Sequence, residues 1–219
     1  MFRFRTLVLV PLVIVAMSRV AIAAPILFTA TLNSAQENNP LNTSTATGFA
    51  TFELNDAQTA LTWTATVFGL DFGGQTPGNP ADDLTVAHIH RSPVGVNGPV
   101  VWGFIGTPFN DIIPNPLPPG ETIKTPFTDA VGGTVSSKWD LTEGNGLFEG
   151  QPVTLANQLP FLLNGGTYIN FHTTQFGGGE IRGQILQVSD SVSVPEPATL
   201  ALLGIGVACF GLRRKSARP

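Results

Sequence analysis

The chain has 219 residues, 42% of them hydrophobic, and a formal net charge of −4 at pH 7. The segment 24–193 holds 14 acidic residues against four basic ones, a net charge of about −10, because the other basic residues lie near the two ends; the four are Arg91, Lys124, Lys138 and Arg182. So acidic a segment lacks the basic clusters that phosphate backbones require, which argues against nucleic acid as a partner.

The first 23 residues have the three parts of a secretory signal peptide. Arg3 and Arg5 supply a positive start, residues 7–17 are apolar, and Ala21-Ile22-Ala23 offers small residues for cleavage. We therefore expect an exported protein whose mature domain begins near Ala24. The only cysteine, Cys209, lies in the C-terminal tail, so this domain has no disulfide and must be stabilised by packing or by a metal.

The segment 24–188 alternates apolar and polar residues, which is typical of strands with one buried face. In 61–67 the apolar residues Leu61, Trp63, Ala65 and Val67 alternate with three threonines. Further strands are predicted at 28–32, 50–54, 84–90, 98–105, 132–140, 167–174 and 180–187, with a short helical turn within 153–163 and long surface loops at 71–83 and 106–131. Strands of this number and length predict an all-β fold, an antiparallel β-sandwich or Greek-key barrel.

All three histidines lie on predicted strands. His88 and His90 are two residues apart on 84–90, so their side chains point to the same face, roughly 6 to 7 Å apart along the backbone. His172 lies on 167–174, where alternation places it on the same face as Tyr168 and Asn170. Pairing of these two strands would bring the three imidazoles together.

Three neutral imidazoles on a rigid sheet suit zinc or copper, with a fourth position left for water, an acid or a substrate. The strand 180–187 adds Glu180 and Arg182 to the same polar face. The alternative interpretation is that the histidines are solvent-facing or hydrogen-bonded strand residues without a metal. Under either interpretation, we expect Glu180 and Arg182 to form a structural ion pair and predict no catalytic residue.

The C-terminal tail combines a Pro-rich turn, a short apolar segment and a basic stop. Pro195, Glu196 and Pro197 precede the apolar segment 198–212, which is followed by Arg213 and Arg214. Basic residues stay on the cytoplasmic side, and 15 apolar residues make a transmembrane helix shorter than the usual minimum of about 17. A transient inner-membrane anchor therefore fits better than the alternative, a permanent tail anchor.

This tail, residues 195–219 after a linker at 189–194, resembles the PEP-CTERM sorting signal of Gram-negative bacteria. The resemblance implies cleavage near Pro195 to Pro197 by an exosortase-type membrane protease. The upstream domain would then reach the cell surface or the extracellular space.

The body, residues 24–188, resembles the CHRD domain. The resemblance rests on four motifs in order: Ala87-His88-Ile89-His90, then 95–101, 168–173 and 179–185. It implies a mostly β architecture but no particular activity. The strand that carries His88 and His90 is also similar in local pattern to a copper-ligand strand of copper,zinc superoxide dismutase, which is an analogy only.

Three functions are compatible with these features. The favoured one is an exported, non-catalytic CHRD domain protein of the cell surface or extracellular matrix, with a metal-stabilised face and another surface protein as partner. The second is an extracellular zinc or copper enzyme that uses the three histidines as ligands and Glu180 as acid or base. The third is an exopolysaccharide-binding module, for which Trp102 and Trp139 would have to be exposed.

Overall fold

The computed structural model describes residues 24–112 and 122–188. The predicted signal peptide, linker and sorting signal lie outside these ranges. Within the two ranges, no helix is long and apolar enough to span a membrane. The predicted transmembrane helix at 198–212 lies outside the described residues.

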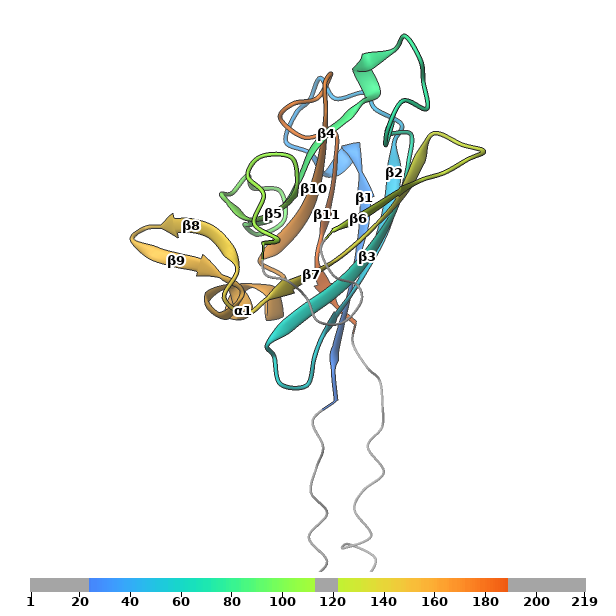
Figure 1. The fold of residues 1–219 in the computed structure, drawn as a ribbon. Coiled ribbons are helices and arrows are strands. Elements are labelled where there is room, and N and C mark those ends of the chain that lie inside the picture. Colours follow the sequence, from blue (N-terminus) through green and yellow to red (C-terminus); the bar gives the residue numbers. More distant parts are fainter. Residues whose placement is uncertain (1–23, 113–121, 189–219) are drawn as a thin grey trace, which may run out of the picture. The chain divides into compact units, whose positions relative to one another are not determined.

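Ten strands form a single antiparallel sheet in the order β5-β4-β10-β11-β1-β2-β3-β7-β6, with β12 paired to β1 (Figure 1). Their bounds are β1 (Ile26–Asn33), β2 (Thr47–Leu54), β3 (Ala60–Phe68), β4 (Leu84–Arg91), β5 (Val100–Ile105), β6 (Ile123–Pro126), β7 (Gly132–Asp140), β10 (Thr167–Thr173), β11 (Ile181–Gln184) and β12 (Leu186–Gln187). A separate hairpin, β8 (Gly144–Phe148) and β9 (Gln151–Thr154), leads into the helix α1 (Leu155–Leu163). Two short 3-10 turns lie at Ser34–Gln36 and Pro80–Asp82.

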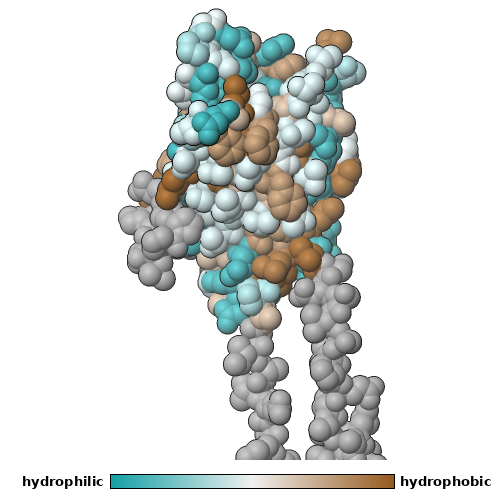
Figure 2. All heavy atoms as spheres, turned by 90° about the vertical axis from the view of Figure 1, so that its right-hand side faces the viewer, coloured by the Kyte–Doolittle hydropathy of each residue, from teal (hydrophilic) through white to brown (hydrophobic). Residues whose placement is uncertain are grey.

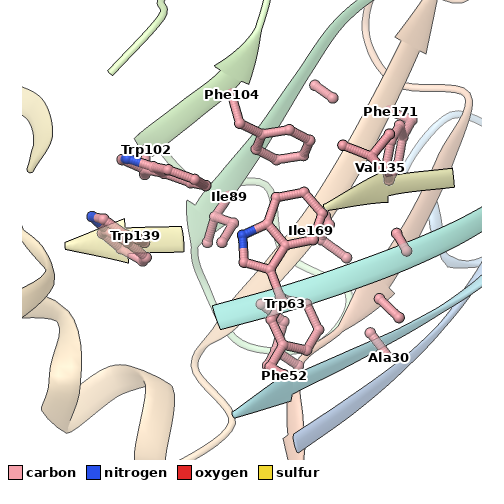
Figure 3. Close-up of a cluster of buried hydrophobic side chains, with 14 of the residues drawn as sticks. Ala30, Phe52, Trp63, Ile89, Trp102, Phe104, Val135, Trp139, Ile169 and Phe171 are labelled. Atoms are coloured by element: carbon pink, nitrogen blue, oxygen red, sulfur yellow. The ribbon is translucent and has the colours of Figure 1, made fainter. Parts of the chain in front are cut away.

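The sheet curls until strands near its two edges pack against each other. Trp102 of β5 stacks on Trp139 of β7 with 5.6 Å between ring centroids, and Trp63 of β3 meets Phe104 of β5 at 4.5 Å (Figure 3). The prediction of an all-β, antiparallel fold is confirmed. In detail, one curled sheet forms a half-barrel and closes over its own core, where the sequence predicted a sandwich or a Greek-key barrel.

The core follows the predicted alternation. Leu61, Trp63, Ala65 and Val67 are buried, and Thr64 between them is exposed. The three tryptophans and five phenylalanines are among the largest fully buried side chains, and they contribute a large share of the buried apolar surface. On the face seen in Figure 2, apolar side chains form separate patches among polar ones, so that view shows no single continuous apolar surface.

Several elements differ from the prediction. The strand β6 lies inside the predicted loop 106–131; all four of its residues are exposed and one is proline, so no alternation marks it. The hairpin β8–β9 was also missed, and the predicted strand 180–187 is divided into β11 and β12. The predicted helical turn is present as α1.

Candidate metal centre

The three histidines meet on adjacent strands. His88 and His90 lie on β4 and His172 on β10, and these strands pair in antiparallel register with Asn170 opposite His88. One ligand nitrogen from each ring lies within 4.8 Å of the others, and the ring centroids are 5.1 to 6.2 Å apart. All three side chains are buried, which was not expected from their polar strand face. Loops cover that face of the sheet.

Each imidazole is held by a backbone carbonyl from a different loop. His90 Nδ1 donates to Gly98 O at 2.9 Å and His172 Nδ1 to Gly177 O at 3.0 Å, while His88 Nε2 has a longer contact of 3.4 Å with Thr107 O. Because a carbonyl oxygen only accepts, these contacts place the proton on the named nitrogens. The opposite nitrogens are left as lone pairs: His88 Nδ1, His90 Nε2 and His172 Nε2, all buried and without a hydrogen-bond partner among the residues described.

Burial keeps these rings neutral. Desolvation lowers the pKa of His88 to about 4 and that of His90 to about 3, and it lowers the pKa of His172 as well. Mutual repulsion adds to the effect at His88 and His90, whereas the carbonyl contacts oppose it. At pH 7 all three imidazoles are therefore in the form that binds metals.

These pKa values predict that the metal-free domain loses stability as the pH falls from 6.5 toward 4. In this window the unfolded chain, with histidines near 6.5, binds more protons than the folded one, so lower pH favours unfolding. Glu37 acts in the opposite sense, because burial raises its pKa to about 7 and the folded state binds its proton first. The three histidines thus act against the single Glu37. After a reduction for partial solvent screening, the free energy of unfolding should fall by about 2 kcal/mol for each pH unit.

Urea denaturation with a chelator at pH 7 and pH 5 measures this slope. The variant His88→Gln should flatten it by about 1 kcal/mol per pH unit, because one of the three titrating imidazoles is gone. An unfolding free energy that does not change between the two pH values would contradict the assignment of neutral, buried rings.

Arg182 and Tyr168 hold the loop that carries Gly98. The Arg182 guanidinium donates to Val96 O at 3.0 Å and Asn97 Oδ1 at 3.3 Å, and it lies 3.5 Å from the centroid of the Tyr168 ring. The Tyr168 hydroxyl accepts from Gly98 N at 3.2 Å, and its ring stacks on His90 at 4.8 Å. Both residues therefore position the carbonyl that orients His90.

Glu180 serves a different part of the fold. One carboxylate oxygen accepts from Ser44 Oγ at 2.5 Å and the other from Thr173 Oγ1, so both oxygens are occupied. Arg182 faces the loop 92–99 instead, and these two described side chains form no ion pair with each other. The predicted ion pair between Glu180 and Arg182 is wrong. The Glu180 carboxylate binds two hydroxyl groups, whereas the Arg182 guanidinium binds the loop 92–99.

The two tryptophans proposed for sugar binding are fully buried. Trp102 and Trp139 are 0% exposed, stack on each other, and Trp139 Nε1 donates to Glu143 O at 2.8 Å. Neither ring is available to a polysaccharide. The exopolysaccharide hypothesis thereby loses these two tryptophans as candidate binding residues.

Sequence reasoning missed the loop groups that orient the site. The carbonyls of Gly98, Thr107 and Gly177 carry no side-chain signal, and only at Gly98 does a close approach of the backbone require glycine. A second cluster of potential metal ligands, made of the acidic residues Asp71, Asp82 and Asp83, was also missed. The Asp71 carboxylate accepts from three backbone N–H groups, of Gly73, Gly74 and Thr76, and so organises its own loop.

Comparison with known families identifies two segments. Residues 28–185 match the CHRD domain, and residues 193–215 match the PEP-CTERM protein-sorting motif. Both predicted resemblances are confirmed. Comparisons with curated proteins and with solved structures gave no match.

Proposed function

Because this chain belongs to the CHRD domain family, we propose that it is an exported, non-catalytic surface protein whose CHRD domain holds one zinc or copper ion between His88, His90 and His172. The sorting motif itself indicates export toward the cell surface in Gram-negative bacteria and processing by exosortase-type machinery. We further propose that the tail anchors the protein transiently in the inner membrane before that processing.

One observation supports the metal most directly. Three buried, neutral imidazoles each use one nitrogen on a backbone carbonyl and leave the other as an unpaired lone pair, with ligand atoms of the three rings within 4.8 Å. Metal-binding histidines commonly donate their second ring nitrogen to a carbonyl, which fixes the tautomer and the ring orientation. An empty site would leave three buried acceptors without donors, an arrangement that is unfavourable in a folded protein.

The three nitrogen ligands limit which metal ions the site can bind. Nitrogen ligands suit zinc and copper, whereas calcium and magnesium prefer oxygen. Three protein ligands leave a fourth position for an exogenous group. The non-catalytic assignment rests on Glu180, the proposed acid or base of the enzyme hypothesis, whose two oxygens are already engaged by hydroxyl groups.

Elemental analysis of the purified protein tests this proposal. We expect about one zinc or copper ion per chain in the natural protein. In His88→Ala or His172→Ala the metal content should fall at least tenfold, because two imidazoles hold such ions weakly. Asp71→Asn is the matched control, since it removes a carboxylate from the other cluster of potential ligands. Negligible metal in the natural protein, or a loss confined to Asp71→Asn, would reject the site.

A further inference from the structure

Asn170 occupies the centre of the polar face. It lies on β10 between Tyr168 and His172, and its register partners are His88 on β4 and Arg182 on β11. Side chains directly opposite each other in antiparallel strands have Cβ atoms about 4.5 to 5.5 Å apart. Asn170 therefore stands between His88 and Arg182 in the sheet, on the same face as both.

The Asn170 side chain is buried but incompletely paired. It is 3% exposed, and its oxygen, Oδ1, has no hydrogen-bond donor in the part of the chain that the structure describes. On its other side, a Cβ added to Gly179 would lie 2.8 Å from Asn170 Nδ2, so the amide nitrogen packs against this glycine. The amide oxygen is the atom left without a partner.

The proposed metal accounts for three of the four unpaired polar atoms on the shared polar face of β4 and β10 but leaves Asn170 Oδ1; a fifth, Thr167 Oγ1, lies on the opposite face of β10. A trihistidine ion has an open fourth position that water normally fills, and water bound to a metal is a strong hydrogen-bond donor. Such a donor is the missing partner of the amide oxygen. Arg182, the register partner of Asn170 on β11, is 1% exposed and adds a buried positive charge to the same face of the sheet.

We propose that Asn170 accepts a hydrogen bond from a water molecule on the metal and thereby controls the exchange of that water for small anions. The inference rests on the proposed function, since it needs an ion at the three histidines. Asn170 acts on the exogenous ligand and not as a fourth protein ligand. Its removal should therefore change anion affinity and leave metal content unchanged.

Azide binding to the copper(II)-loaded protein, followed by the azide-to-copper absorption band, tests this role. Asn170→Leu should bind azide about tenfold more tightly, because the competing water loses one hydrogen bond. Asn170→Asp should bind azide at least tenfold more weakly, because the carboxylate holds the water more strongly and repels the anion. Thr167→Val is the control: Thr167 is buried on the same strand with an unpaired hydroxyl, but it faces the core with Ile169.

Copper content, measured first, separates the two proposals. A natural protein that takes up no copper rejects the metal centre and this inference with it. The role of Asn170 alone is rejected if the natural protein and Asn170→Leu hold equal copper but bind azide with affinities within twofold of each other. It is also rejected if Asn170→Leu binds azide more weakly. If Asn170→Leu fails to fold, Asn170→Asp decides the question, since unchanged azide binding in that isosteric variant overturns the proposal.

Discussion

Replacing Gly98 by alanine is expected to lower the free energy of unfolding by about 3 kcal/mol or more and to abolish metal binding. The added Cβ would lie 2.7 Å from the Arg91 carbonyl carbon, closer still to the Arg91 oxygen, and 2.8 Å from Ser92 Cβ. The two closest atoms are backbone, so relief requires the loop 92–99 to move away from β4. Gly98 also binds both His90 and Tyr168 through its backbone, and the displaced loop would release both.

Gly177→Ala provides the matched control. Gly177 supplies the equivalent carbonyl to His172, but a Cβ there meets nothing within 4 Å and its φ is not positive. The unfolding free energy of Gly177→Ala, measured in urea, and its metal content should stay close to those of the natural protein. If Gly98→Ala proves as stable as Gly177→Ala, the close approach of the loop is not a structural requirement.

Zinc or copper(II) is expected to raise the free energy of unfolding of the metal-free protein by about 4 kcal/mol at a metal concentration 1,000 times Kd. The increment arises because the folded state assembles ligands from β4 and β10, which are far apart in the unfolded chain. Denaturation curves recorded with a chelator and with added metal give the two free energies directly.

His90→Asn isolates the contribution of the imidazole. The asparagine amide nitrogen is three bonds from Cα, as His90 Nδ1 is, so it can donate to Gly98 O, but the ring nitrogen that binds the metal is removed. The metal-dependent increment should then fall below about 1 kcal/mol, although the metal-free stability changes less. An increment that persists in full would place the bound ion elsewhere.

Much of the fold follows from alternation along single strands. The pattern in 61–67 assigns Leu61 and Trp63 to the core because side chains of a strand alternate between two faces. The same argument separates His172 from Phe171 and gives His88 and His90 a common face. Alternation does not specify which strands are neighbours, so it could not distinguish two packed sheets from one sheet that curls.

The rest of the site depends on loops, for which the sequence has no period. All seven residues of β10 are buried, because connections from distant parts of the chain cover its polar face. Trp102 illustrates the same limit: its strand β5 lies at an edge of the sheet, and only the curl brings Trp139 onto its ring. Exposure of an aromatic residue therefore could not be judged from its place in the sequence.

The short strand β12 has a mechanical consequence. It is held to β1 by only two residue pairs, Phe28 with Gln187 and Thr29 with Leu186, and it lies off the main path of the sheet. Leu186 and Gln187 can therefore separate from β1 with the loss of few backbone hydrogen bonds. The histidine-bearing strands β4 and β10 pair with each other and not with β12, so their pairing does not depend on it.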